Sequence, residues 1–171
     1  MNNLIFEFSA TECCGWPYLR TILNNEIIDE QQITHSTYKY TLNLDGVDGA
    51  CHLIFERFNK TNDNTQVDCH GNIVKDQCVT LEKILIDNVE LPMSYLWQGV
   101  FEFNNTQHPG ALSWGPNGQW HWYFDSPVLD WAISIKNYNR QNIKELFVPV
   151  GESLSKYKQF INKIKHKFHD L

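Results

Sequence analysis

Hydrophobic and polar residues alternate with a period of two along much of the first 125 residues. The runs Leu4–Phe8 and Tyr38–Leu42 show this alternation most clearly. Because successive side chains of a strand point to opposite faces of a sheet, each run predicts a half-buried strand. The same reasoning predicts strands at Tyr18–Leu23, Glu26–Ile33, His52–Phe58 and Val79–Leu91.

Turn residues separate these runs. Asn24-Asn25 joins two of the predicted strands, and Pro116-Asn117-Gly118 lies between Ala111–Gly115 and Gln119–Asp125. Asn and Gly tolerate the positive φ angles of tight turns, so the second set predicts a hairpin. Short strands with turns between them predict an all-β fold, a jelly-roll-like antiparallel β-sandwich over residues 1–151.

Residues 152–171 have a different pattern. Apolar residues recur there at spacings of three and four, and lysines occupy the other positions, which predicts an amphipathic α-helix at the C-terminal end, over residues 153–168. We expect its apolar side to dock on the sandwich or to form an oligomer. Binding of its lysines to a membrane surface or an anionic partner is the alternative. The apolar side consists of Leu154, Tyr157, Ile161, Ile164 and Phe168.

Charge and cysteine content narrow the classes of partner. The net charge is −6, and the lysines of residues 152–171 leave the rest of the chain more acidic still, which argues against nucleic acid as a partner. No apolar run is long enough for a membrane span, and the start of the sequence predicts no signal peptide, so we expect the protein to be made in the cytoplasm.

Five cysteines, two of them adjacent, predict free thiols. A zinc site is the alternative, drawn from Cys13, Cys14, Cys69, His70 and Cys78.

A polar segment at residues 59–76 interrupts the predicted strands. Asp63, Asp68 and Asp76 lie in it among asparagines. Carboxylate and amide oxygens are the ligands that calcium prefers, so the segment predicts a calcium site. An ordinary polar loop with Asx turns is the alternative.

Aromatic side chains supply candidates for ligand binding. Trp and Tyr rings stack on the apolar faces of sugar rings, although most Trp side chains in a small β domain belong to the core. The candidates are Trp16, Tyr18, Trp97, Trp114 and Tyr123. Catalysis has weaker support. The candidate acids are Glu56, Glu82 and Glu102, which lie within predicted strands. A glycoside hydrolase would need two of these carboxylates to face each other, and alternation alone does not show that they do.

The order of several segments resembles that of the calcium-dependent, xylan-binding type of carbohydrate-binding module, a small jelly-roll sandwich. The similar segments are Leu4–Phe8, Glu12–Gly15, Tyr18–Asn25, Ser36–Thr41, Leu53–Asn59 and Asp76–Val89. The resemblance covers residues 4–91. It implies calcium ligands at Glu12, Asn59 and Asp76, with Asp63 and Asp68 as further ligands. Residues 60–75 have no counterpart in that family.

These observations predict a non-catalytic module that binds glycans. The free cysteines, and a sandwich that is not joined to a catalytic domain, would suit an accessory protein of a virion, in a phage capsid or tail. The alternatives are a purely structural viral assembly or decoration protein, and a two-carboxylate glycoside hydrolase.

Overall fold

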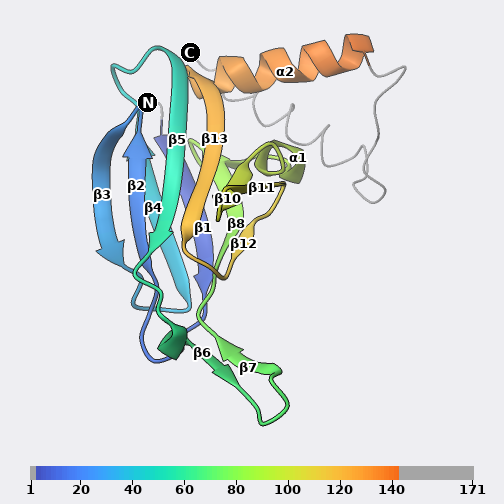
Figure 1. Cartoon of the computed structure of the whole chain (residues 1–171). Helices are drawn as coiled ribbons and strands as arrows, with labels where there is room; N and C mark the ends of the chain where they lie inside the picture. The colour runs from blue at the N-terminus through green and yellow to red at the C-terminus, as the bar shows by residue number, and fades with distance from the viewer. Residues whose placement is uncertain (1–2, 143–171) are drawn as a thin grey trace.

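Two antiparallel sheets face each other in the computed structural model, which describes residues 3–142 (Figure 1). The first sheet has the order β12-β8-β1-β4, with β9 paired to β8, and the second has the order β11-β10-β13-β5-β2-β3. The predicted antiparallel β-sandwich is thus confirmed. The strands of the first sheet are β1 (Asn3–Ala10), β4 (Thr37–Asn43), β8 (Val79–Ile86), β9 (Val89–Glu90) and β12 (Ser113–Trp114). Those of the second are β2 (Tyr18–Leu23), β3 (Glu26–Gln32), β5 (Gly49–Phe58), β10 (Val100–Phe103), β11 (Thr106–Pro109) and β13 (Gly118–Ser126).

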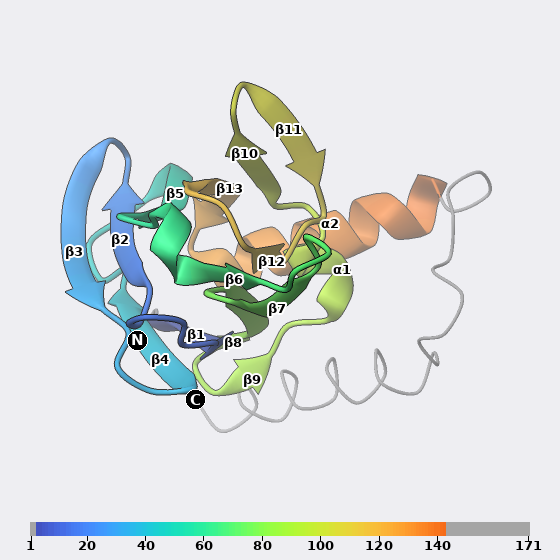
Figure 2. The ribbon, with the colours of Figure 1, turned by 60° about the horizontal axis from the view of Figure 1, so that its bottom comes forward.

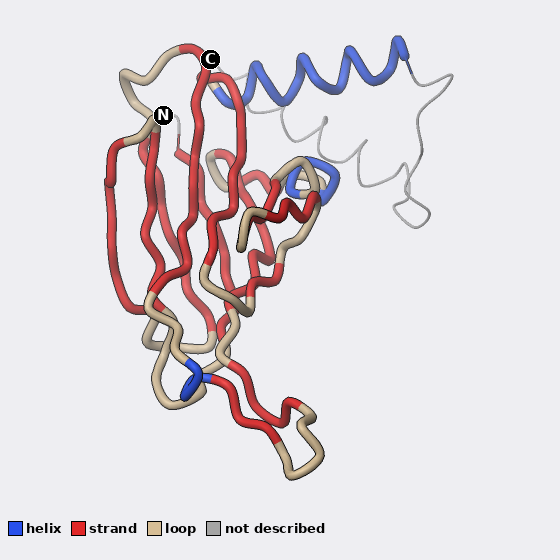
Figure 3. The backbone as a smooth tube through the Cα atoms, viewed as in Figure 1, coloured by secondary structure: helices blue, strands red, loops and turns tan. Residues whose placement is uncertain are grey.

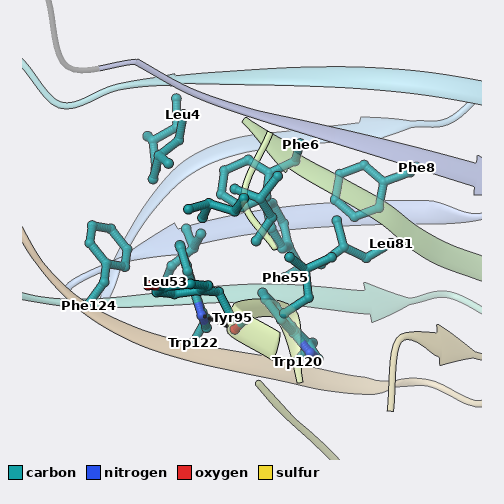
Figure 4. Packing of buried hydrophobic residues seen from close by; sticks show 14 of the residues in the cluster. Leu4, Phe6, Phe8, Leu53, Phe55, Leu81, Tyr95, Trp120, Trp122 and Phe124 are labelled. Carbon is teal, nitrogen blue, oxygen red and sulfur yellow. Dashed lines mark hydrogen bonds between the residues drawn. The ribbon is translucent and has the colours of Figure 1, made fainter. Parts of the chain in front are cut away.

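Aromatic rings fill the space between the sheets (Figure 4). Phe55 of β5 lies edge-on to Phe6 and Phe8 of β1, with ring centroids 4.8 and 5.1 Å apart. Trp120 and Trp122 of β13 are fully buried beside them. Buried and outward residues alternate along β13, so His121, Tyr123 and Asp125 lie on the outer side of the second sheet.

The chain around Pro116-Asn117-Gly118 corrects one prediction. Trp114 pairs with Val79 in the first sheet, whereas Gly118 pairs with Arg57 in the second. The two segments are therefore an arch between the sheets and do not form a hairpin. Their partners come from distant parts of the sequence, so local turn chemistry does not specify the pairing.

Two other turns behave as their sequences suggest. Asn24 and Asn25 have φ angles of 50° and 71° and join β2 to β3. Asp87 and Asn88, at 45° and 70°, divide the predicted strand Val79–Leu91 into β8 and β9. Asn and Asp accept this left-handed conformation more readily than most residues, which explains why both turns are tight.

Helices cover one open side of the sandwich. The short helix α1 (Met93–Leu96) and the helix α2 (Val128–Asn142) meet there, where Trp131 packs edge-on against Trp122 with centroids 5.4 Å apart. The hydroxyl of Tyr95 also donates to the carbonyl of Ala132 over 2.7 Å. The helix α2 was not predicted, although Val128, Trp131 and Ile135 recur at helical spacing. The predicted helix at 153–168, its oligomer contacts and the boundary at residue 151 lie outside the described residues.

The polar segment at 59–76 forms a hairpin that projects from the sandwich, as the red strands of Figure 3 show. A 3-10 turn (Asn62–Asn64) leads into β6 (Thr65–Val67), which pairs only with β7 (Ile73–Asp76). Figure 2 views the molecule from this end and shows β3 and β11 at opposite edges of the second sheet. No helix within residues 3–142 is long and apolar enough to cross a membrane.

Candidate functional site

A row of polar side chains crosses the outer face of the second sheet from one edge to the other. Strand register places one residue from each of the six strands in this row. Alternation sends all of them outward, because their neighbours along β5 and β13 are buried core residues. We call this set the polar row: Glu30, Arg20, Glu56, Gln119, Glu102 and Gln107.

Hydrogen bonds link neighbours within the polar row. Arg20 donates to Glu30 over 2.7 Å and to Glu56 over 2.5 Å, and its guanidinium lies 4.5 Å above the ring of Phe58. The bond with Glu30, followed by the charge of Glu56, raises the pKa of Arg20 above its ordinary value. Gln119 donates to the other oxygen of Glu56 over 3.1 Å. These side chains hold one another in place, so this half of the face is preorganised.

Three aromatic side chains lie beside the row on β5 and β13. We call His52, His121 and Tyr123 the histidine–tyrosine cluster. The ring of Tyr123 stacks on His52 with centroids 4.2 Å apart and an interplanar angle of 9°. The Nε2 atom of His52 lies 3.0 Å from the Nδ1 atom of His121. Tyr123 is 62% exposed, so a large ring is held flat on its neighbour at the surface.

Both histidines favour the neutral form. Burial lowers the pKa of His52, and the nearby His121 lowers it further. Burial also lowers the pKa of His121, while Glu102 acts in the opposite direction. Near pH 7 each ring therefore carries one proton, and one ring donates to the other.

The outer face of the second sheet carries excess negative charge. Glu30, Glu56, Glu102 and Asp125 lie on it, and Arg20 is the only lysine or arginine among the outward-facing strand residues. This distribution disfavours anionic ligands and is compatible with neutral ones.

The predicted aromatic residues have different positions. Tyr123 belongs to the cluster, and Tyr18 lies at the opposite end of the same face against Phe58, with centroids 5.6 Å apart. Trp97 is 43% exposed at the end of α1, and Trp16 is half-buried against the core. Trp114 corrects the prediction. It is fully buried, stacked on Phe101 at 5.7 Å, and its indole has no surface for a ligand.

Two of the predicted calcium ligands form ion pairs with lysines. Glu12 accepts from the backbone N–H of Gly15 and forms an ion pair with Lys75, and these bonds lower its pKa. Asp76 forms an ion pair with Lys60 over 2.5 Å. Burial opposes ionisation of Asp76, but hydrogen bonds from Lys60, Thr65 and Cys78 outweigh it and lower the pKa.

The other predicted ligands serve local structure or lie apart. Asp68 accepts from the backbone N–H groups of His70 and Asn72 and closes the tip of the hairpin. Asp63 lies in the first turn of the 3-10 segment, and Asn59 adopts a φ of 61° at the end of β5. Across the described residues, no three His, Cys, Asp or Glu side chains come together in a way that could hold a metal. The arrangement therefore does not fit the predicted calcium site, nor the alternative zinc site. All five cysteines are free thiols, as predicted.

The candidate catalytic carboxylates are only partly brought together. Glu56 and Glu102 share the polar row, with Gln119 between them, whereas Glu82 lies on β8 in the first sheet and accepts from Ser9. Both oxygens of Glu56 are occupied, one by Arg20 and one by Gln119.

Comparisons with known proteins give little beyond the fold. No protein-family model and no curated protein matches the chain. It is similar to a solved structure of vCBM60 in complex with galactobiose, at 12% identity and a TM-score of 0.46, over 71% of this chain and 97% of that one. It is also similar to the selenomethionine form of vCBM60, at 12% identity and a TM-score of 0.47, over 71% of this chain and 90% of that one. The latter is described in connection with a circular permutation that links two families of calcium-dependent carbohydrate binding modules. These values are too low to carry a functional argument.

Proposed function

We propose that the protein binds glycan chains, without catalysing a reaction on them, through the outer face of the six-stranded sheet. The observation that carries this proposal is the position of Tyr123, a largely exposed ring stacked flat on His52. Exposed aromatic rings that are held in one orientation suit the apolar face of a sugar ring.

Hydrogen-bonding groups next to the cluster suit the sugar hydroxyls. The polar row places carboxylates and amides of Glu102, Gln107 and Gln119 beside His121. Their side chains are supported by neighbours, so a bound sugar would order few additional groups. An aromatic platform beside fixed polar groups is the usual composition of a small-molecule site.

The length of the face suits a chain of sugars better than a single ring. His52 and Phe58 mark its two aromatic ends on β5, and six residues of strand span about 20 Å. Tyr18 lies beside Phe58 at the far end. The negative charge between the ends makes a neutral glycan the expected ligand.

Binding of the full chain to a panel of immobilised neutral oligosaccharides tests the proposal. We expect binding by the wild type, and an affinity reduced at least about tenfold in Tyr123→Ala. Tyr123→Phe retains the stacked ring and is expected to bind nearly as well as the wild type. Trp97→Ala is the matched control, since it removes an exposed aromatic ring from α1 and should leave the affinity unchanged.

Three results would contradict the proposal. They are no binding across the panel, equal affinity for Tyr123→Ala and the wild type, and a loss confined to Trp97→Ala. Release of reducing sugar that disappears in Glu56→Gln would instead support the glycoside hydrolase alternative. Thermal melting of each variant shows whether it is folded, because Tyr123 is exposed and its removal should change the free energy of unfolding by less than about 0.5 kcal/mol.

A further inference from the structure

The ammonium group of Lys60 lies at the foot of the projecting hairpin, where three oxygens surround it. Its Nζ atom donates to Asp76 Oδ1 over 2.5 Å, to the Gly115 carbonyl over 2.9 Å and to the Gln77 carbonyl over 3.3 Å. A lysine ammonium has three donors, so all of them are used. The side chain of Lys60 is only 12% exposed.

These oxygens come from two parts of the chain, residues 76–77 and Gly115, and both are distant in sequence from Lys60. Asp76 ends β7, Gln77 links it to β8, and Gly115 belongs to the arch between the two sheets. Thr65, at the start of β6, donates to the same oxygen of Asp76 as Lys60 does. The ammonium therefore connects the end of β5 to β7 and to the arch, and it shares its carboxylate partner with β6.

The backbone of Lys60 is fixed as firmly as its side chain. Its N–H donates to the side-chain oxygen of Asn117 over 2.9 Å, and its carbonyl accepts from the side-chain nitrogen of Asn117 over 3.0 Å. The ammonium is thus placed by the fold and does not sample the surface as an ordinary lysine does.

A carboxylate and two carbonyl oxygens around one cation are the donor set that proteins also offer to metal ions. From this geometry we propose that Lys60 is the resident cation of this junction, and that the junction is a site for an ammonium group which needs no calcium. The nearby Arg57 strengthens this assignment. Its buried guanidinium donates to the same Gln77 carbonyl, so a divalent ion in place of Lys60 would meet a second positive charge.

Thermal unfolding of the full chain tests the inference, with and without saturating CaCl2 and with EDTA. We expect the melting temperature of the wild type to be the same in all three conditions. Lys60→Ala is expected to melt roughly 4–8 °C lower, because it leaves Asp76 without its ion-pair partner. Methylammonium chloride should restore part of that loss by occupying the vacated position, while NaCl at the same ionic strength should not.

Lys39→Ala is the matched control. Lys39 forms an exposed ion pair with Glu7 on the first sheet, and its removal should neither lower the melting temperature by more than a degree or so nor create a response to methylammonium. A rise in the wild-type melting temperature with calcium would overturn the inference. So would a Lys60→Ala protein that melts like the wild type, or one that methylammonium and NaCl affect equally.

A second pair of variants keeps the test informative if Lys60→Ala does not fold. Lys60→Met retains the apolar stem, and Lys60→Met/Asp76→Asn also removes the unpaired carboxylate. Removal of both charges costs less than removal of one, so the double variant should melt above Lys60→Met. Melting temperatures that fall additively would contradict a direct role of the ammonium. None of these outcomes depends on glycan binding, so failure of this inference and failure of the proposed function can be told apart.

Discussion

His52 and His121, on neighbouring strands of the second sheet, share one hydrogen bond between ring nitrogens 3.0 Å apart. Only one proton fits between those two nitrogens. The neutral pair is therefore compatible with the bond, whereas two protonated rings would point N–H groups at each other. Tyr123 stacks on His52, so its exposed ring lies directly against this hydrogen-bonded pair.

The first prediction concerns the stability of the fold between about pH 5 and pH 7. The pKa of both histidines is lowered from 6.5, mainly by burial. As the pH falls through 6.5, the unfolded chain takes up these protons before the folded chain does. The free energy of unfolding should therefore decrease toward acid until the folded pKa values are passed.

Urea unfolding at a series of pH values measures this decrease. His52→Gln/His121→Gln should show a shallower dependence on pH than the wild type. Equal slopes in the wild type and the double variant would show that the pair does not titrate as described. If the glycan proposal also holds, affinity should fall over the same pH range.

The second prediction concerns the charge of the ligand. Four carboxylates and one guanidinium lie on the outer face, so a uronate-rich polysaccharide should bind more weakly than a neutral one of the same linkage. Glu102→Gln removes one carboxylate next to His121 and keeps its shape. We expect this variant to have a smaller difference in affinity between the uronate-rich and the neutral polysaccharide than the wild type has. Glu90→Gln, on the first sheet, should not.

The dependence of affinity on salt concentration shows whether electrostatic repulsion causes this difference. Repulsion between an anionic ligand and the face is screened by salt, so binding of the uronate-rich ligand should improve as the ionic strength rises. A preference for the anionic ligand at low salt would contradict the charge argument, although not glycan binding itself.

The sequence predicts the strands and their inner faces well, because alternation is a local property. Along β13 the alternating residues separate as such a pattern requires, with Trp120 and Trp122 buried and Tyr123 exposed. Alternation could not reveal the histidine–tyrosine cluster, since that depends on the register between β5 and β13, which are separated by more than fifty residues. The two histidines occupy outward positions in predicted strands, and this is the only signal of them in the sequence.

The calcium prediction fails for a different reason, because the chemistry of a side chain does not show which partner it meets in the fold. Asp76 has the chemistry of a metal ligand, and the sequence around it is rich in oxygen donors. Whether a carboxylate meets an ion or a lysine depends on which distant side chain reaches it, and here Lys60 does. Likewise, the local pattern that marks Trp114 as a candidate for binding cannot show that β12 pairs with β8 and buries it.

The third prediction concerns Gly99 and Trp120, which touch at the end of α1. A Cβ atom at Gly99 would lie 2.2 Å from two carbon atoms of the Trp120 indole. Gly99→Ala should therefore destabilise the fold by about 1–3 kcal/mol, because the buried ring must move. Trp120→Phe removes the indole atoms in question, so Gly99→Ala should cost less in that background than in the wild type. Urea unfolding of the wild type, the two single variants and the double variant gives the coupling energy between the two positions. If the two free-energy changes simply add, the destabilisation by Gly99→Ala does not come from contact with the Trp120 indole.

The fourth prediction concerns Asn64, which fastens the projecting hairpin to the first loop of the sandwich. Its side-chain nitrogen donates to the carbonyl of Cys13 over 3.0 Å, and its side-chain oxygen accepts from the N–H of Thr61 over 2.9 Å. The residue is buried, so Asn64→Ala leaves both groups without their partner and should cost about 1–3 kcal/mol.

Asn72→Ala, at the exposed tip of the same hairpin, is the control and should cost no more than about 0.5 kcal/mol. Hydrogen exchange gives a local measurement. In Asn64→Ala the amides of β6 and β7 should exchange faster, while those of β5 and β13 change little, because a two-stranded hairpin has little stability of its own. Equal protection of the hairpin in both variants would mean that the ion pair of Lys60 with Asp76, and not Asn64, holds the hairpin to the sandwich.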